Sequence, residues 1–493
     1  MAKESKNYPP NINDERDVRL KKMQDLCDRG YDPFPSESHK KNTVLQALSK
    51  PPETRVSVAG RIMLKREMGK IAFAQVHDQS GNIQIVLKLG DIEEEAFKTF
   101  VKKIDAGDII EVMGTRFQTQ SGQESILVQS WTLLAKALRP LPDKVHGLQD
   151  EELKLRKRYL DLMTDPELRD VFYRKAIFWS SMREFLVKRD FLEVETPVLE
   201  ASAGGADATP FMTHHNALDM DVYLRISMGE LWQKRLMVAG FEKTFEIGRQ
   251  FRNEGMSREH LQDYMQMEFY WAYANYKDSM KLVQKMYQHV IKKTYGSLQF
   301  SAIGTFQDID LSGSWGTIDY RSTIKEHTGI DILKAKNDAI RKTLGELNVT
   351  FQDNEGRGRL IDSLWKFCRK QIKGPVFLIN LPVEVSPLAK RQKKNSSLTE
   401  RYQIIIAGSE LGNGYTELND PIDQAARFDD QSALREAGDT EAQMHDHDFV
   451  EALEYGMPPT TGFGVSERLF SFLENRPIRE CVLFPLVKPK QEE

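Results

Sequence analysis

The sequence lacks any run of 18 or more apolar residues, so we expect neither a transmembrane helix nor a membrane partner. Residues 1–17, MAKESKNYPPNINDERD, contain no apolar segment of the kind that a secretory signal needs. Cys27, Cys368 and Cys481 are the only cysteines, and they have neither CxxC spacing nor an even number. This pattern predicts neither a zinc cluster nor a disulfide framework, and it is typical of a chain that works in a reducing cytoplasm.

A strong excess of one charge is also missing, because 69 Lys and Arg stand against 73 Asp and Glu, for a net charge of −4. This argues against a small DNA-coating module, whereas a large enzyme with one local RNA-facing surface need not be basic. Neither GxxxxGK[ST] nor a kinase-type HRD set occurs, which excludes the two commonest ATP-binding designs. A length of 493 residues with 40% hydrophobic residues predicts two or more well-cored domains.

In the N-terminal third, a helical pattern of apolar residues gives way to a strand-like one. Residues 11–30 predict a charged helix with Val18, Met23 and Leu26 on one side. From Val56 onward, five strand-like runs follow, separated by glycine turns, with the helical stretch EEEAFKTFVKKI before the fourth run. This pattern predicts a five-stranded β-barrel of the OB type, a fold that commonly grips single-stranded nucleic acid. A barrel that only holds the chain together is the alternative.

The remaining sequence predicts a mixed arrangement of helices and strands, so the whole chain is expected to be α+β. The expected boundaries are an N-terminal helical extension over 1–50, the barrel over 51–140, a linker over 141–165, and a large domain over 166–490. A helical insertion with few motifs is expected at about 275–375.

Residues 242–274 predict a long-looped antiparallel hairpin, whose return strand alternates between two kinds of side chain. One face is apolar and is expected to form core: Met265, Met267, Phe269 and Trp271. The other face carries Tyr264, Gln266, Glu268 and Tyr270. A carboxylate on a buried sheet face is costly unless a cation docks beside it, so this face is a candidate binding site.

A second alternating segment, ELGNGYTELNDP, places Asn413, Tyr415 and Glu417 on one face. Two strands therefore each offer a carboxylate and a tyrosine, although either glutamate alone could simply face solvent at a sheet edge. In TGFGVSERLFSFL, small residues precede Arg468 near the start of a helix. Together with Arg252 it gives two arginines suited to clamping a polyphosphate, while packing glycines are the alternative explanation of the turn.

These segments resemble the three signature motifs of class II aminoacyl-tRNA synthetases: FLEVETPVL with Pro197 resembles motif 1, FRNEG through MEFY motif 2, and GFGVSERL motif 3. Within the class, the chain resembles the lysyl-tRNA synthetases over nearly its whole length. The segments that carry this likeness are GGADATPFMTHHNALD (204–219), LPVEVSPLAK (381–390), LGNGYTELNDP (411–421) and FVEALEYGMPPT (449–460).

The resemblance implies an OB domain that reads the anticodon, followed by a class II catalytic domain with an antiparallel six-stranded sheet flanked by helices. It further implies ATP-dependent activation of L-lysine to lysyl-adenylate, transfer of lysyl to the 3′ end of tRNA(Lys), and a homodimer formed through motif 1 around Pro197. Two carboxylates in a partly dry pocket suit a lysine ammonium and repel an acidic substrate.

The family's site residues map onto this sequence as follows. The resemblance implies that ATP is bound by Arg252, Glu254, His260, Tyr264 and Arg468, with Arg252 and Arg468 catalytic. It implies that lysine is bound by Gly205, Glu230, Glu268, Tyr270, Asn413 and Glu417, and that anticodon bases meet Phe73 and Gln84. Mg²⁺ is the implied cofactor, held by Glu410 and by Gln403, where the family usually has a second glutamate.

The chain departs from the family at several positions. Gln403 removes a charged metal ligand, which should weaken Mg²⁺ binding or make it depend more on the ATP phosphates. The turn GFGVSER is one residue shorter than usual, with Ser466 in place of a further glycine, and SMGELWQKRL is one residue longer before its glutamate. Ser130 occupies a barrel position where an acidic residue is frequent. We interpret these changes as those of a divergent lineage.

Three alternatives remain open at this point. An aspartyl- or asparaginyl-type synthetase shares both the barrel and the class II core, but needs a pocket for an acidic or amide side chain. A paralogue that lysylates a protein typically lacks the OB domain. An RNA-binding relative that has lost catalysis is supported by Gln403 alone.

Overall fold

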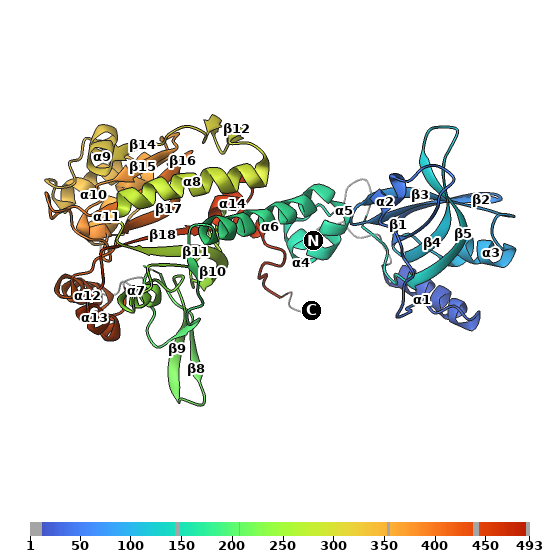
Figure 1. The fold of residues 1–493 in the computed structure, drawn as a ribbon, viewed down its shortest axis with the longest axis horizontal. Coiled ribbons are helices and arrows are strands. Elements are labelled where there is room, and N and C mark those ends of the chain that lie inside the picture. The colour runs from blue at the N-terminus through green and yellow to red at the C-terminus, as the bar shows by residue number, and fades with distance from the viewer. Residues whose placement is uncertain (1–11, 143–147, 207, 353–354, 437–442, 490–493) are drawn as a thin grey trace, which may run out of the picture. The chain divides into compact units, whose positions relative to one another are not determined.

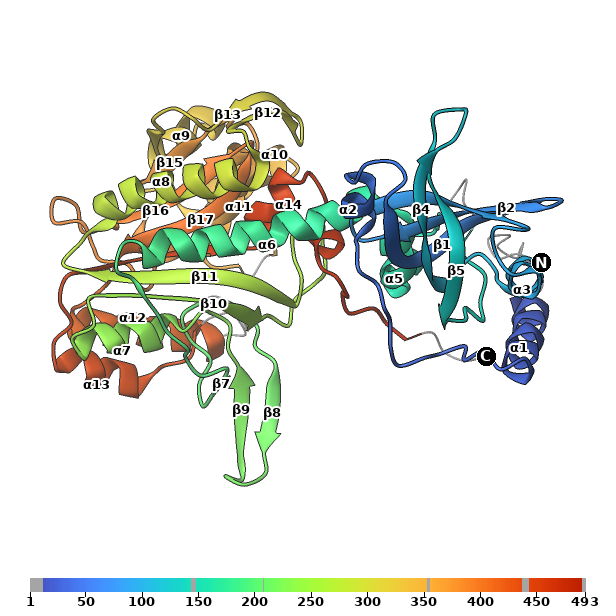
Figure 2. The same ribbon diagram turned by 45° about the vertical axis from the view of Figure 1, so that its right-hand side comes forward.

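The computed structural model describes residues 12–142, 148–206, 208–352, 355–436 and 443–489. The chain divides into two compact units, Met1–Asp165 and Pro166–Glu493, whose elements are drawn in Figures 1 and 2. Residues 1–11 of the predicted N-terminal extension and residues 143–147 of the predicted linker lie outside the described residues. In the part of the chain that is described, no helix has both the length and the apolar character needed to cross a membrane.

Five strands of the first unit close into a barrel in the order β1-β2-β3-β5-β4. They are β1 (Arg55–Met68), β2 (Ile71–Asp78), β3 (Gly81–Lys88), β4 (Ile109–Gln118) and β5 (Glu124–Ala135), with α3 (Glu94–Lys103) between β3 and β4. Their inward side chains, among them Val58, Val76, Ile85 and Val112, are fully buried. The predicted OB-type barrel is confirmed, because strict alternation leaves one apolar face that only closure can bury.

Four further helices belong to this unit. They are α1 (Ile12–Asp28), α2 (Val44–Leu48), α4 (Glu151–Arg156) and α5 (Arg158–Thr164). A capping box closes the start of α2. The Thr43 hydroxyl accepts from the Gln46 N–H, and the Gln46 side-chain oxygen accepts from the Thr43 N–H. The Asp150 side chain caps α4 in the simpler way, by accepting from the Leu153 N–H.

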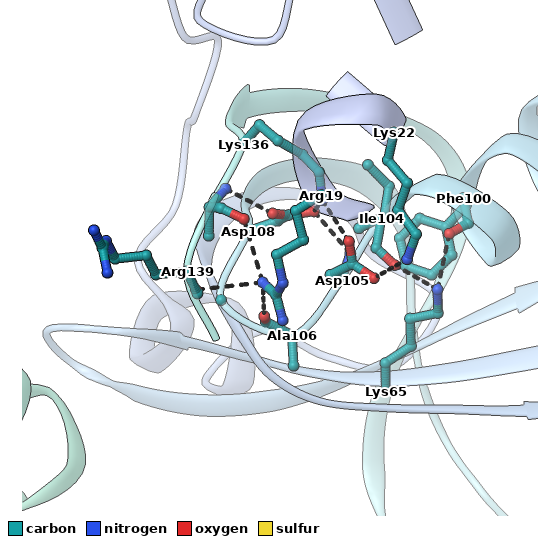
Figure 3. A network of polar contacts seen from close by, with 12 residues as sticks. Arg19, Lys22, Lys65, Phe100, Ile104, Asp105, Ala106, Asp108, Lys136 and Arg139 are labelled. Atoms are coloured by element: carbon teal, nitrogen blue, oxygen red, sulfur yellow. Dashed lines mark hydrogen bonds and ion pairs between the residues drawn. The ribbon is translucent and has the colours of Figure 1, made fainter. Parts of the chain in front are cut away.

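The apolar residues that were predicted to share one side of α1 are not equally buried. Val18 is 51% exposed, whereas its neighbour Arg19 is only 6% exposed. In Figure 3 the Arg19 guanidinium points into a polar network, where Nη1 donates to the carbonyl oxygens of Ala106, Ala137 and Arg139 at 2.9, 3.2 and 3.4 Å. Arg19 is buried here because loop carbonyls that need donors select an arginine, while Val18 beside it stays exposed.

The same network contains two aspartates and two lysines. Lys136 Nζ pairs with Asp105 and Asp108, both at 2.7 Å, and Lys22 Nζ reaches Asp105 at 2.6 Å. Beside them, Lys65 Nζ donates to the carbonyls of Val101 and Ile104 at the C-terminal end of α3, at 2.6 and 2.5 Å (Figure 3). Burial lowers the pKa of Lys65 to about 8. An ammonium at this place satisfies carbonyl groups that the end of a helix leaves unpaired.

The second unit is built on an eight-stranded sheet of order β14-β15-β16-β17-β18-β11-β10-β6. Its strands are β6 (Leu192–Glu193), β10 (Lys243–Phe251), β11 (Asp263–Ala272), β14 (Gly316–Asp319), β15 (Val376–Ile379), β16 (Arg401–Ile406), β17 (Ser409–Thr416) and β18 (Thr460–Ser466). The six strands from β15 to β10 pair antiparallel, while β14 and β6 add short parallel edges. The predicted six-stranded antiparallel sheet is therefore confirmed, extended at both sides.

The main core lies between one face of this sheet and two long helices, α6 (Pro166–Val187) and α8 (Tyr276–Tyr295), which run side by side in both views (Figures 1 and 2). Phe178 and Val283 from the helices pack with Phe269 and Phe463 from the sheet. Beyond the other face lie α7 (Glu230–Val238), α12 (Pro421–Glu436) and α13 (His447–Glu454), which share a second apolar cluster with Tyr270 of β11. The residues of that face are consequently held between two packed layers.

Smaller elements complete the unit. Helices α9 (Tyr320–Thr328), α10 (Asn337–Glu346) and α11 (Arg357–Arg369) form a third cluster with β15. The strands β12 (Gln299–Ile303) and β13 (Phe306–Asp310) form a hairpin, and β7 (Leu199–Glu200), β8 (Met212–His215) and β9 (Met220–Leu224) form a three-stranded sheet. Helix α14 (Arg468–Leu473) follows β18 directly.

Replacing Arg19 with methionine removes the donors that three loop carbonyls use, while keeping most of the side-chain volume. We expect the free energy of opening the barrel to fall by about 1–3 kcal/mol. Native-state hydrogen exchange at the amides of β1 and β4 measures that quantity. Val18→Ala is the matched control and should change it by less than about 0.5 kcal/mol; a larger loss there than at Arg19 would contradict the assignment.

Candidate active site

A cavity of about 340 Å³ opens on the face of the large sheet that is opposite the main core. Most of the predicted site residues line it: Gly205, Glu230, Arg252, His260, Tyr264, Glu268, Tyr270, Glu410, Asn413, Glu417 and Arg468. Glu254 and Gln403 are not among its lining residues. Glu254 lies on the loop after β10, where its carbonyl oxygen accepts a bond from Gln262 Nε2 at 2.9 Å.

The alternation along β11 places the polar face of that strand in the cavity. Met267 and Phe269 are fully buried in the main core, whereas the side chains between and beside them line the cavity: Tyr264, Gln266, Glu268 and Tyr270. The neighbouring strand β18 makes room with glycines. A Cβ atom on Gly462 would lie 2.3 Å from Glu417 Oε1, so a side chain there would fill the space that the carboxylate occupies.

Glu268 is buried, and all its hydrogen-bond donors are neutral. Oε1 accepts from Met228 N at 3.1 Å and from Gln266 Nε2 at 2.6 Å, and Oε2 accepts from the Tyr270 hydroxyl at 3.0 Å. Burial, together with the neighbouring Glu230, raises the pKa of Glu268 to about 7. A carboxylate held in this way gains stability from a cation that enters the cavity.

The other two carboxylates share an ammonium that sequence reasoning missed. Lys234 Nζ lies 2.7 Å from Glu230 Oε1 and 2.6 Å from Glu417 Oε2, and its side chain is 1% exposed. The Tyr415 hydroxyl also donates to Glu230 Oε1. Burial opposes the charged form of Lys234, but Glu230 and Glu417 outweigh that effect and raise its pKa. The available sequence signal was the i, i+4 spacing of Glu230 and Lys234 on one helix, which usually marks a surface pair.

The opposite end of the cavity is lined by cationic and aromatic side chains. The Arg252 guanidinium lies 6.0 Å from the centre of the Tyr264 ring, and Arg468 forms an ion pair with Glu259. Loss of hydration and the nearby Arg468 lower the pKa of His260, which favours its neutral form at pH 7. In this arrangement the Glu259 carboxylate occupies one side of an arginine whose planar donor fork suits phosphate oxygens.

Arg369, the last residue of α11, is a further cation near this end that the sequence did not indicate. Its Nε and Nη1 atoms are buried and have no hydrogen-bond partner among the described residues. Burial, and to a smaller extent the charge of Arg369, lowers the pKa of Arg468. Two arginines within electrostatic reach of each other repel, which an anion between them would relieve.

Asn413 is oriented by a neighbour. Arg401 Nε donates to Asn413 Oδ1 at 2.8 Å. A guanidinium cannot accept hydrogen bonds, so the amide oxygen must face Arg401 and the amide nitrogen is left to donate into the cavity. A donor at this position suits a carboxylate group of a ligand.

The two candidate metal ligands lie on the neighbouring strands β16 and β17. Glu410 lines the cavity, whereas Gln403 is buried in β16 opposite Asn413 and its Oε1 has no hydrogen-bond partner in the described ranges. Among those residues, no group of three or more His, Cys, Asp or Glu side chains is placed to hold a metal ion. Mg²⁺ commonly takes one or two carboxylates and completes its shell with water and phosphate oxygens. Glu410 fits that requirement, and the role of Gln403 stays a prediction.

Residues 150–488 match the family described as tRNA synthetases class II (D, K and N), and residues 56–134 match the OB-fold nucleic acid binding domain. The chain belongs to the class II tRNA synthetases. It is 43% identical to the lysine–tRNA ligase of Thermotoga maritima over 489 residues, which is 97% of both chains. It is 44% identical to that of Carboxydothermus hydrogenoformans over 97% of this chain and 99% of the relative.

The barrel of the synthetase carries the two predicted anticodon residues on its outer surface. Phe73 on β2 and Gln84 on β3 are half-buried, between neighbours whose side chains fill the barrel. Gln84 Nε2 donates to Ser125 Oγ at 2.9 Å, which fixes the amide on the neighbouring strand β5. The ring of Phe73 and the amide of Gln84 thus lie on adjacent strands of one face.

The segment before Glu230 contains a glycine whose conformation has a structural reason. Gly229 precedes α7 with φ = 66°, a left-handed conformation, and a Cβ there would lie 2.1 Å from Thr196 Oγ1. This turn directs the Met228 N–H to Glu268 and starts the helix that carries Glu230 and Lys234. This turn therefore helps to build the cavity wall.

Gly229→Ala should disturb this turn through both strain and the clash with Thr196. We expect the KM for the amino-acid substrate to rise about ten- to hundredfold, because Met228 N and Glu230 would shift. Gly240→Ala is the control: Gly240 has φ = 93° at the other end of α7, but nothing lies within 4 Å of its Cβ position. An equal rise in KM for both variants would contradict the role assigned to the turn.

Proposed function

We propose that this synthetase activates L-lysine with ATP to form lysyl-adenylate, releases pyrophosphate, and transfers lysyl to the 3′ end of tRNA(Lys). The observation that carries the proposal is the buried Glu268, which has three neutral donors and lies beside Tyr270. This arrangement suits a ligand that brings a positive charge on a side chain. The relatives named lysine–tRNA ligase support lysine as that ligand.

In the proposed complex the cavity holds each part of lysine by a different group. The side-chain ammonium lies between Glu268, Tyr270 and Glu417, and the α-ammonium meets Glu230 and the backbone of Gly205. The donors of Arg252 and the amide nitrogen of Asn413 hold the carboxylate. This orientation places the carboxylate against the α-phosphorus of ATP, so the first step needs alignment and charge stabilisation but no general base.

ATP is proposed to lie along the cationic end of the cavity. Tyr264 stacks on adenine, Arg252 holds the α-phosphate, and Arg468 with His260 faces the outer phosphates. An anion there would replace Glu259 on Arg468 and relieve the repulsion between Arg468 and Arg369. Glu254 and Gln403 stay predictions, because they do not line the cavity.

Mg²⁺ is the proposed cofactor, and Glu410 would hold it. When bound, the ion would neutralise charge on the ATP phosphates. Because Gln403 is not among the cavity-lining residues, oxygen atoms of the ATP phosphates would supply most of the other Mg²⁺ ligands.

The barrel is proposed to bind the anticodon of tRNA(Lys). The ring of Phe73 would stack on a base, which contributes about 1–3 kcal/mol with little sequence preference. Selectivity would then come from hydrogen bonds by polar neighbours such as Gln84.

Glu268→Gln keeps the shape of the pocket but removes its charge. We expect kcat/KM for lysine to fall about 10²- to 10³-fold, because the side-chain ammonium loses a buried counter-ion, while the KM for ATP stays within about threefold. Lysine-dependent pyrophosphate exchange measures both constants. Glu346→Gln, in an exposed ion pair with Lys342 on α10, is the control and should change neither. Equal losses for lysine and ATP would exclude the pocket assignment, and exchange supported by aspartate or asparagine would favour the sister enzymes.

We also propose a homodimer through motif 1 around Pro197. Pro197 is exposed, and it is flanked by exposed apolar side chains at Leu192, Val198 and Leu199. An apolar strip of this kind is typical of a surface that another chain covers.

Leu199→Lys should weaken that assembly, because a buried unpaired charge is costly in an interface. We expect the sedimentation coefficient to shift from that of a dimer towards that of a monomer. Leu434→Lys on α12 is the matched control, since Leu434 is 43% exposed and Leu199 is 47% exposed. A wild-type protein that sediments as a monomer at micromolar concentration would refute the proposal.

A further inference from the structure

The lysine end of the cavity carries more negative charge than one ammonium can balance. Three carboxylates gather there, Glu230 on α7, Glu268 on β11 and Glu417 just after β17, and all three are buried. Lys234 is the one ammonium that pairs with any of them among the described residues. With all four groups charged, this end has an excess of two negative charges, a state that is strongly unfavourable away from water.

Lys234 does not itself line the cavity. It lies behind Glu230 and Glu417, which both do, and it contacts them from the side of α7. Its ammonium is 5.5 Å from the centre of the Tyr415 ring and 5.8 Å from that of Phe449. Lys234 therefore acts on a ligand without touching it, through its charge and through the two carboxylates that it holds, which makes it a positioning residue.

We infer that Lys234 sets the charge of the cavity so that it matches a substrate with two ammonium groups. Lys234 cancels one of the three carboxylates, and the remaining two charges are balanced by the α-ammonium and the side-chain ammonium of lysine. The substrate carboxylate is balanced separately by Arg252. This inference rests on the proposed function, and it assigns specificity to a residue that never touches the substrate.

The rings packed around Lys234 supply no charge that could take over this role. Tyr415 on β17 and Tyr270 on β11 are neutral, and Phe449 of α13 is apolar. Arg235, next to Lys234 on α7, points elsewhere and pairs with Asp446 at 2.9 Å. Arg401 also lines the cavity and lies within electrostatic reach of Tyr415, but its guanidinium donates to Asn413, Val385 and Ser386. Among the described residues, Lys234 is therefore the one cation paired with the carboxylates at this end.

A double-mutant cycle tests the inference. Lys234→Met leaves one uncompensated negative charge in the lysine complex, and Glu417→Gln leaves one uncompensated positive charge. We expect each single variant to weaken lysine binding about 100-fold, because a buried charge loses its partner. The double variant K234M/E417Q restores the balance and should bind lysine at least about tenfold more tightly than either single variant.

The cycle is measured by calorimetric titration of the full-length protein with lysine, and ATP binding and thermal unfolding of each variant report whether it is folded. If K234M alone does not fold, the inference is still tested by comparing the lysine affinity of E417Q with that of the double variant. A double variant that binds more weakly than E417Q would overturn the inference, whereas recovery supports it. A purely structural lysine would give losses that add.

Proton linkage gives a second readout. In the wild type, lysine binding should strengthen as pH rises through about 7, because the carboxyl group of Glu268 must release its proton to receive the ammonium. In K234M the lysine complex has one uncompensated negative charge, so one carboxylate must keep a proton. As the pH rises and this proton is lost, the affinity of K234M for lysine should fall. This fall should begin at least about one pH unit below the pH at which the affinity of the wild type begins to fall. The double variant should return this decline to the wild-type position; an unmoved decline in K234M would contradict the inference.

Lys243→Met is the matched control. Lys243 also lies near two aromatic rings, those of Phe191 and Trp271, and it donates to the Arg189 carbonyl at 3.0 Å. None of these contacts involves the three carboxylates of the cavity. It should leave the affinity for lysine and the pH dependence unchanged. Failure of the wild type to exchange pyrophosphate with lysine would refute the proposed function. Wild-type activity together with additive losses in the cycle would refute only the inference.

Discussion

Burying three carboxylates on one sheet face is the constraint on which the second unit depends. The chain meets it in two different ways. Glu230 and Glu417 share the Lys234 ammonium, while Glu268 receives only neutral donors and holds a proton near pH 7. The cost of this charge is tolerated because a ligand with the opposite charge lowers it, so the same feature that destabilises the empty cavity provides affinity for a cation.

The antiparallel sheet makes this arrangement rigid. Phe269 anchors β11 in the main core. The preceding side chain, Glu268, points to the opposite face and therefore has little freedom to turn away from the cavity. Gly462 on the adjacent strand and Gly229 before α7 make the space that the carboxylates and the helix start occupy. Specificity therefore rests on backbone positions as well as on the charged side chains: a larger residue at Gly462 would enter the space of Glu417, and one at Gly229 would clash with Thr196.

Much of the fold could be predicted from local patterns, because those patterns survive folding unchanged. The period-2 alternation of residues 263–272 identified both the core face and the cavity face of β11, and regular strands with glycine turns identified the barrel. The burial of Arg19 in α1 could not be predicted, since helical periodicity cannot foresee unpaired carbonyls in a distant loop that select an arginine. Resemblance pointed to Gln403 as a metal ligand; it is buried in β16 opposite Asn413, a residue that lines the cavity, but Gln403 is not itself among the lining residues.

The sequence by itself determined which chemistry the chain carries: the strand alternation, the arginines of the signature motifs and the paired carboxylates are all properties of short segments. Only the tertiary structure decided how those charges are balanced. Lys234 looks like half of an ordinary helix-surface pair in the sequence, because Glu230 is four residues away. It becomes a buried counter-ion only when α7 packs against the sheet and brings Glu417, 183 residues further along the chain, within 2.6 Å. Burial then turns a weak surface pair into a strong constraint, since the same two charges interact far more strongly away from water.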